Sequence, residues 1–404
     1  MQTLLPSQLE KLDKFKTQKV GADFGEPGTG KTRSTMEYIK STPAILCVWI
    51  APFGTINPPV GQSGIKDEVA KWGGLNIETI FIAPETISMS DRQYLQLTRK
   101  LSEAWCSFVV VDESLKIKNW DAKRTRRIIE LGKLAEYKMI LNGTPISRNL
   151  LDVWAQMEFL SPLILKMGQA EYKNTICEYT TVKKRIGNRW YQKEFITGYH
   201  NVDYLFSIIE PYVYDCNLQL EVSKQYIDLP YVLSNEHKEE YQKLKEKYLD
   251  DETLQWKNNN IFLELTMKMQ HLYCTTEDKF AVLDEFLKNV DRTKVIIYRK
   301  FIDSEVQLKK HYPDIPVMSI QSHSMSLNMQ QYNITVYWDK TWDYAVENQS
   351  EHRTFRTGQT ETCKFVKMTG DANLESLMNE NVNKKGQLLH YFKEKGYKEL
   401  MKKL

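Results

Sequence analysis

The sequence predicts an α/β protein of two tandem lobes, each a mostly parallel sheet flanked by helices, with an excursion between them. In the first part of the chain, short apolar runs rich in β-branched residues alternate with polar stretches of helical character. This rhythm stops near residue 160 and returns beyond residue 290. The length of 404 residues also suits two or three domains better than one.

The first lobe is expected over residues 1–160. Its candidate strands lie at 19–24, 44–52, 77–83, 107–113 and 138–144, and its candidate helices include 31–40 and 91–104. The runs 107–113 and 138–144 end in polar residues, as buried strands do where they deliver side chains to the ligand-binding edge of a parallel sheet. Chemistry is therefore expected at the ends of these two strands.

Residues 161–230 are expected to form the excursion, and 231–404 the second lobe. Within the excursion, 181–195 predicts two strands around a Gly187-Asn188 turn, with basic and aromatic residues mixed along them. The second lobe begins with charged helical sequence, continues with strands and ends in a lysine-rich helical segment. Its candidate strands lie at 293–301, 333–338 and 363–369.

Composition excludes some classes of protein. The six cysteines stand apart, without a CxxC pair or a histidine spacing that suits a metal cage, so reduced thiols are expected. The longest apolar stretch is about half the length of a membrane span, which predicts a soluble, cytoplasmic protein without a membrane partner. The formal net charge of +3 does not itself indicate nucleic-acid binding, so local basic clusters carry that question.

The sharpest motif is the segment 25–32, GEPGTGKT, which follows a predicted strand and opens a predicted helix. In such a P-loop the glycines let backbone N–H groups converge on phosphate oxygens, Lys31 neutralises the outer phosphates and Thr32 reaches Mg²⁺. The motif therefore predicts ATP and Mg²⁺ as ligands. The residues expected to hold the nucleotide are Gly25, Gly28, Thr29, Gly30, Lys31 and Thr32.

A pair of carboxylates ends the buried run 107–113. Asp112 is expected to hold Mg²⁺, together with Thr32, and Glu113 to orient and deprotonate the attacking water. An acidic strand end is common by itself. Its spacing from the P-loop supports a role at the nucleotide, and the pair of carboxylates favours hydrolysis over simple nucleotide storage.

The ordered motifs of this chain resemble those of superfamily 2 helicases, in particular the Swi/Snf-like branch and its small phage-encoded members. The motifs are GEPGTGKT, VVVDES, LNGTPISRNLLDVW and the segment 349–359, which ends in RTGQ. They extend over nearly the whole chain. The resemblance implies two tandem RecA-like lobes, whereas sequence periodicity alone supports two α/β lobes.

The resemblance also implies roles for residues outside the P-loop and the acidic pair. Gln8 matches the glutamine that reads adenine, and Gly143-Thr144 matches the segment that couples the nucleotide to nucleic acid. Gln349, Arg353 and Arg356 match the second-lobe catalytic motif that supplies an arginine finger to the γ-phosphate. The alternative for these arginines is a solvated basic loop.

Two positions depart from the pattern of the resembled branch. Leu115 stands where many relatives carry the histidine of a DExH motif, which affects coupling more than hydrolysis. Ser326 replaces an expected glycine in a loop that contacts both ATP and the nucleic-acid strand in that branch.

Two basic runs are candidates for nucleic-acid contact. The first follows the acidic pair and includes Lys118, and the second lies on the predicted hairpin with Arg185, Arg189 and Trp190. Aromatic residues among the basic ones favour the hairpin, because bases stack on aromatic rings. The alternative for both runs is a solvated charged face.

Taken together, these features predict an ATP-dependent DNA translocase or helicase, stimulated by nucleic acid and used in phage replication, recombination or fork remodelling. Its partners would be nucleic acid, most simply DNA, and replication or recombination proteins. The pathway rests on the resemblance alone. The alternatives are an RNA-dependent ATPase and a nucleotide-gated nucleic-acid clamp or loading protein that does not separate strands.

Overall fold

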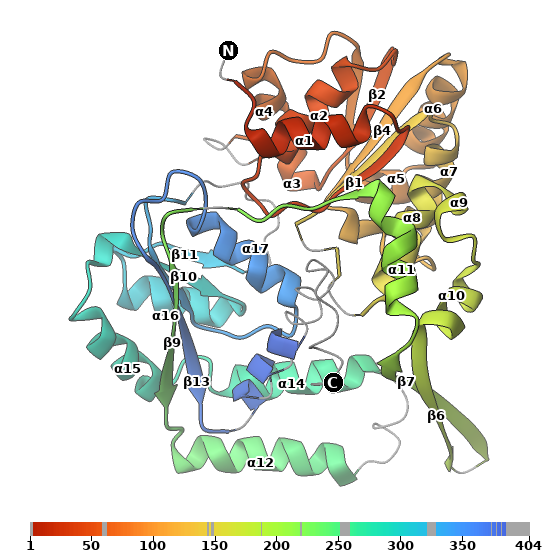
Figure 1. The fold of residues 1–404 in the computed structure, drawn as a ribbon. Helices are drawn as coiled ribbons and strands as arrows, with labels where there is room; N and C mark the ends of the chain where they lie inside the picture. Colours follow the sequence, from red (N-terminus) through yellow and green to blue (C-terminus); the bar gives the residue numbers. More distant parts are fainter. Residues whose placement is uncertain are drawn as a thin grey trace.

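The computed structural model describes residues 3–384 except 59–62, 144, 147–148, 187, 219, 251–258, 321–328, 373, 377 and 381. Two α/β lobes lie against each other, and a hairpin projects from the side (Figure 1). Each lobe contains a parallel sheet with helices on its faces, which confirms the predicted fold class. Among the described helices, none combines the length and apolar character needed to cross a bilayer.

The first lobe is built on a six-stranded sheet of order β3-β2-β4-β5-β1-β8, in which every pairing is parallel. The strands are β1 (Val20–Asp23), β2 (Leu46–Ile50), β3 (Glu78–Ile82), β4 (Ser107–Asp112), β5 (Tyr137–Leu141) and β8 (Val213–Tyr214). Both faces of the central strands are covered, because Val109 and Val111 belong to one apolar core while Phe108 and Val110 belong to the other. Burial on both faces explains why these strands read as continuous apolar runs.

Helices cover both faces of the first sheet. Those on one face are α1 (Pro6–Phe15), α2 (Lys31–Lys40), α3 (Phe53–Ile56) and α4 (Ile65–Lys71). Those on the other are α5 (Pro84–Met89), α6 (Asp91–Glu103), α7 (Lys123–Lys133) and α8 (Leu151–Leu160). A short 3₁₀ helix, η1 (Ser114–Ile117), follows β4.

The excursion contains the predicted hairpin. Strands β6 (Cys177–Ile186) and β7 (Arg189–Tyr199) pair antiparallel around residues 187–188, with Arg185 opposite Trp190. The helices beside it are α9 (Pro162–Leu165), α10 (Gln169–Ile176), α11 (Val202–Ile209) and η2 (Glu210–Tyr212). The hairpin extends away from both sheets (Figure 1).

After the hairpin the chain returns to the first lobe. Strand β8 pairs in parallel with β1, so that Asp23 lies opposite Tyr214. The first sheet therefore takes a strand from beyond residue 160, and the second sheet takes one that begins at Lys224, before residue 231. The domain limits of 160 and 230 mark changes in sequence pattern, whereas the two sheets divide between Tyr214 and Lys224.

The second lobe has a five-stranded parallel sheet of order β11-β10-β12-β13-β9. Its strands are β9 (Lys224–Tyr231), β10 (Val295–Arg299), β11 (Val317–Ser319), β12 (Ile334–Tyr337) and β13 (Cys363–Gly370). Its helices are α12 (Asn235–Asp250), α14 (Asn259–Leu272), α15 (Glu277–Leu287), η3 (Arg292–Lys294), α16 (Ile302–His311) and α17 (Tyr344–Thr354). Helix α17 covers the face of this sheet that lies toward the first lobe (Figure 1).

The connector, residues 215–223, joins the two lobes and runs along the P-loop. Phe24 N–H donates to the carbonyl of Tyr214 at 2.8 Å, and Glu26 N–H donates to the carbonyl of Cys216 at 2.9 Å. Further along, Leu218 N–H donates to the Glu26 carboxylate at 2.8 Å, and its side chain packs on the core of the second lobe. The connector therefore contacts the P-loop and the second lobe at once.

Candidate nucleotide site

The P-loop lies between the end of β1 and the start of α2, as the motif requires. Gly28 has φ +93° and Gly30 has φ +79°, a left-handed conformation that L side chains rarely adopt. Gly30 immediately precedes α2, so the turn delivers the chain to a helix N-terminus, where free N–H groups favour anions. Thr29 is held within the loop, because its hydroxyl donates to the Glu26 carbonyl at 2.8 Å.

The Lys31 ammonium lies inside the P-loop. It donates to the carbonyl of Gly25 at 2.7 Å and to that of Glu26 at 3.1 Å. Burial lowers the pKa of Lys31, and the negative charge of Asp23 opposes this most. These two carbonyls are neutral partners that phosphate oxygens can replace.

The two carboxylates at the end of β4 are buried together. Burial raises the pKa of Asp112 to about 7, and the neighbouring Glu113 charge acts in the same direction. Burial also raises the pKa of Glu113, while the charges of Lys31 and Lys116 oppose this. Glu113 has φ +54°, a left-handed conformation that is costly for a residue with a side chain and that occurs often at functional sites.

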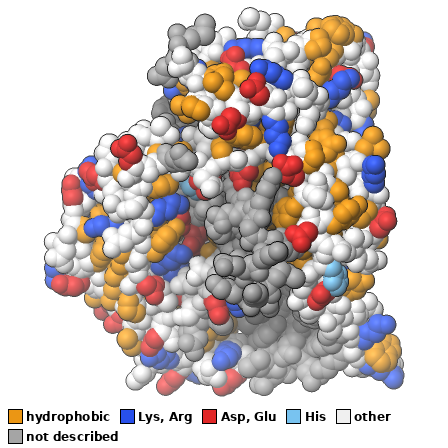
Figure 2. Space-filling model, viewed as in Figure 1, with side chains coloured by type: hydrophobic (Ala, Val, Ile, Leu, Met, Phe, Trp, Pro, Cys, Tyr) orange, Lys and Arg blue, Asp and Glu red, His pale blue; other side chains and the backbone are white. Residues whose placement is uncertain are grey.

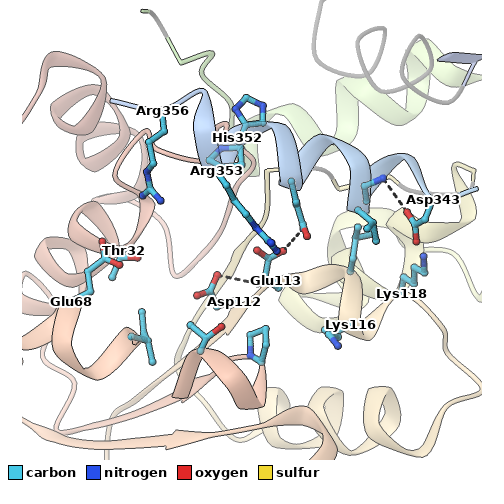
Figure 3. Close-up of a pocket in the computed structure, with 18 of the residues that line it drawn as sticks. Thr32, Glu68, Asp112, Glu113, Lys116, Lys118, Asp343, His352, Arg353 and Arg356 are labelled. Carbon is cyan, nitrogen blue, oxygen red and sulfur yellow. Dashed lines mark hydrogen bonds between the residues drawn. The ribbon is translucent and has the colours of Figure 1, made fainter. Parts of the chain in front are cut away.

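Helix α17 of the second lobe and the residues just after it present three predicted residues to the acidic pair and the P-loop (Figure 3). Gln349 donates its amide to the Glu113 carboxylate at 2.9 Å, which is a direct hydrogen bond between the lobes. Arg353 points toward Glu113, whereas Arg356 points toward Thr32 and Glu68 (Figure 3). Burial lowers the pKa of Arg356, and the negative charge of Glu68 opposes this.

A cavity of about 360 Å³ lies between the lobes at this place. Predicted residues line it from both sides: Thr32, Asp112, Glu113, Lys118, Gln349, Arg353 and Arg356. Lys116 and Arg124 of the first basic run, expected to contact nucleic acid, line it too, as do three residues to which the sequence assigned no role: Glu68, Asp343 and His352. No motif marked Glu68, which lies in an ordinary charged helix of sequence IKDEVAK and reaches the cavity only because of how that helix packs.

Gln8 lies beside the P-loop on α1. Its amide donates to the Gly30 carbonyl at 3.4 Å, and its carbonyl accepts from Leu5 N–H at 3.0 Å. Gln8 is buried and is not among the residues that line the cavity. Adenine recognition by Gln8 therefore stays a prediction.

Gly143 follows β5 and packs against the P-loop. A Cβ atom at this position would lie 2.7 Å from the ring of Pro27, so a side chain here would push the two segments apart. This contact places the predicted coupling segment against the nucleotide loop, while its coupling role stays a prediction. Thr144 lies outside the described residues, as does Ser326, whereas Leu115 lines the cavity.

The donor set suits Mg²⁺ held with nucleotide phosphates. Thr32 and Asp112 both line the cavity and offer a hydroxyl and a carboxylate, oxygen ligands of the kind that Mg²⁺ prefers. Across the described ranges, no three His, Cys, Asp or Glu side chains form a metal-binding group. With nucleotides, Mg²⁺ commonly takes one or two ligands from protein and the rest from phosphate and water.

The two basic runs lie in different surroundings. In the first, Lys116, Lys118, Lys123 and Arg127 each form an ion pair with an acidic residue of the same lobe. Lys118 is only 17% exposed and lies 4.0 Å from the Asp152 carboxylate. The hairpin is far more open, because Trp190 is 71% exposed and Lys183 and Arg185 are exposed as well. Figure 2 shows basic and apolar side chains together at the lower right, where the hairpin lies.

The fold and the cavity together define a class of protein. It is a P-loop protein of two parallel-sheet lobes, in which helix α17 of the second lobe contacts the Glu113 carboxylate at the end of β4 in the first lobe. The chain belongs to the SNF2-related domain family, which matches residues 66–312. The P-loop and α17 lie outside that range, so the structure alone places them at one site.

Several known proteins are similar to this chain. An uncharacterized ATP-dependent helicase of Mycoplasma genitalium is 22% identical over 360 residues, covering 75% of this chain and 33% of that protein. The ISWI chromatin-remodeling complex ATPase ISW1 of Saccharomyces cerevisiae is 22% identical over 462 aligned positions, covering 94% of this chain and 39% of that protein. The chain thus spans a third or slightly more of the length of these relatives.

The solved structures similar to this chain include the Sulfolobus solfataricus SWI2/SNF2 ATPase core in complex with dsDNA. It is 17% identical with a TM-score of 0.45, and the match covers 96% of this chain and 92% of that one.

Proposed function

We propose that this chain hydrolyses ATP between its two lobes and uses the cycle to move along DNA. The observation that carries the proposal is the hydrogen bond from Gln349 of α17 to Glu113 at the end of β4. It brings a second-lobe helix to the carboxylate that would activate water. Membership of the SNF2-related family and the names of the relatives, which include an ATP-dependent DNA helicase of Arabidopsis thaliana, support the same function.

Nucleotide binding is assigned to the P-loop. Its N–H groups and the Lys31 ammonium would bind the phosphates, and Lys31 would exchange the carbonyls of Gly25 and Glu26 for phosphate oxygens. Thr32 and Asp112 would hold Mg²⁺, which neutralises phosphate charge when bound.

Water activation is assigned to Glu113. A buried carboxylate with a raised pKa is a stronger base than a solvated one, and the Gln349 amide fixes the orientation of its oxygens. Arg353 points at the same carboxylate, whereas Arg356 points toward the P-loop threonine and suits the role of a finger on the γ-phosphate (Figure 3). The two arginines would therefore serve different groups of the same site.

Nucleic-acid contact is assigned to the hairpin. Every charged residue between 182 and 193 is basic, and the exposed Trp190 offers a surface on which a base can stack. Origin in a phage, and a role in replication, recombination or fork remodelling, belong to this proposal on the resemblance of the motifs alone.

The test is ATP turnover with Mg²⁺ and single-stranded DNA, duplex DNA, forked DNA or RNA, followed by displacement of a third strand from a DNA triplex. Stimulation by DNA together with triplex displacement is the expected result. Turnover that RNA stimulates best would establish the RNA-dependent alternative. Stimulation by DNA without displacement would establish the clamp, and absence of turnover under every condition would overturn the proposal.

A further inference from the structure

A buried pair of opposite charges lies directly beneath the P-loop. The Lys11 ammonium of α1 lies 2.6 Å from the Asp23 carboxylate at the end of β1, and both side chains are almost completely excluded from solvent. Buried charges are costly unless they are paired, so removal of one partner has consequences for the other. Neither residue belongs to the motifs that indicated the nucleotide site.

Lys11 is linked to both ends of the P-loop through its two partners, Asp23 and Ser34. On the strand side, its partner Asp23 accepts the N–H of Gly25 at 3.1 Å, which fixes the first turn of the loop. On the helix side, the Lys11 ammonium donates to the Ser34 hydroxyl at 3.1 Å, and Ser34 in turn donates to the Gly30 carbonyl at 3.2 Å. One ammonium thus connects the two anchor points between which the phosphates would bind.

Asp23 is also close to the lysine that would bind those phosphates. The Lys31 ammonium contacts the carbonyl of Gly25, whose N–H is held by Asp23. Burial lowers the pKa of Lys31, and Asp23 is the charge that opposes this most. Without Lys11, the Asp23 carboxylate would keep Lys31 as a cation with which it interacts.

We propose that Lys11 is a positioning residue for nucleotide binding: it neutralises Asp23, so that this carboxylate holds the Gly25 turn without drawing Lys31 away from the phosphates. The inference rests on the proposed function of the P-loop. Lys11 does not touch the cavity and acts only through Asp23 and Ser34.

The experiment measures binding of a fluorescent ATP analogue with Mg²⁺, steady-state turnover and thermal unfolding for Lys11→Met, Asp23→Asn and the double variant. In Lys11→Met the affinity should fall on the order of tenfold, and KM should rise far more than kcat falls, because the chemistry at Glu113 is untouched. In the double variant most of the affinity should return, because no carboxylate remains to capture Lys31.

Lys279→Met is the matched control. Lys279 is an equally buried lysine, 3.7 Å from Asp339 in the second lobe and far from the P-loop. It should lower the unfolding temperature while leaving analogue affinity unchanged, which separates loss of a buried charge pair from loss of positioning.

Three results would overturn the inference: wild-type affinity in folded Lys11→Met, no recovery in the double variant, or an equal loss of affinity in the Lys279→Met control. If Lys11→Met does not fold, the comparison moves to the Asp23→Asn background. There, addition of Lys11→Met should change affinity by less than about twofold, and a tenfold loss would count against the proposal. Failure of the wild-type protein to bind the analogue would instead contradict the proposed function.

Discussion

At the scale of single residues, the site depends on side chains held in costly states. Glu113 has a left-handed backbone conformation and is buried beside Asp112, so two carboxylates and a strained backbone meet at one strand end. The structure tolerates this because Lys31, Lys116 and the Gln349 amide stabilise the Glu113 charge. Such strain is common where a side chain must point at a substrate.

Replacement of Glu113 by glutamine should separate binding from turnover. Glu113→Gln keeps the size of the side chain but removes the base, so ATP binding should stay within a few-fold of wild type while kcat falls by at least about a hundredfold. Lys31→Ala should instead lose binding, because phosphate neutralisation disappears. Equilibrium binding and single-turnover hydrolysis check both variants. Turnover near the wild-type rate in Glu113→Gln would remove Glu113 from the mechanism.

Lys340 predicts a pH dependence of stability. Burial lowers its pKa from the ordinary value of 10.5 to about 8, so between these values the unfolded chain binds a proton that the folded chain does not. The free energy of unfolding therefore rises as the pH increases from about 8 to 10.5. Below about pH 8 the folded protein bears the full cost of burying the charged Lys340 ammonium. Lys340→Met should raise unfolding stability at pH 7 by roughly 1–3 kcal/mol, with a smaller gain at pH 10. Denaturant melts at both values test this, with the exposed Lys309→Met as control. An equal gain at both values would contradict the assignment.

At the scale of elements, local sequence predicts the strands and the P-loop. It does not predict that α17 contacts the end of β4. Apolar runs predicted β4 and β5, and GEPGTGKT predicted the turn into α2. Strand β8 has two residues, too few to leave a periodic signal, so the sequence could not show that β1 has a neighbour on that side. Glu68 and the Lys11–Asp23 pair were missed for a similar reason, because packing between helices and strands, and not spacing along the chain, brings them to the site.

The hairpin carries its own prediction. Arg185→Ala, Arg189→Ala and Trp190→Ala together should weaken DNA affinity about tenfold or more, since a stacked base and two phosphate contacts are lost. ATP turnover without DNA should not change. The matched control removes an arginine, a lysine and an equally exposed tryptophan from the first lobe, as Arg99→Ala, Lys133→Ala and Trp105→Ala. DNA binding by fluorescence anisotropy, repeated at rising salt, distinguishes the two sets. Equal losses would mean that general charge, and not the hairpin, sets affinity.

At the scale of the whole molecule, the cavity exists because two lobes contribute to it. Lobe closure would bring Arg356 and Gln349 to a nucleotide held by the P-loop, and the connector would transmit movement of that loop to the second lobe. The sequence predicted both lobes and the ordered motifs. Relative placement of the lobes depends on contacts between residues more than two hundred positions apart, such as Glu113 and Gln349, and these leave no local pattern.

Arg356 should affect catalysis from across this cavity. Arg356→Ala should bind ATP nearly as wild type yet hydrolyse it at least about a hundredfold more slowly, even with DNA present. Arg356→Lys should rescue poorly, because a point charge does not reproduce a planar fork of donors. Binding and DNA-stimulated turnover measure the separation, and Arg292→Ala, an exposed ion-pair arginine of the same lobe, is the control. Stimulated turnover retained in Arg356→Ala would exclude the finger role.

The position of β8 also bears on how the protein is made. During synthesis, β5 is complete at Leu141, whereas Tyr214, which pairs with the other edge of β1, follows more than seventy residues later. An open edge strand can pair with another copy of the same chain. The hairpin region is therefore synthesised after the P-loop and before β8, the strand that completes the first sheet. A chain that stalls before residue 213 would leave the edge of β1 exposed beside the P-loop.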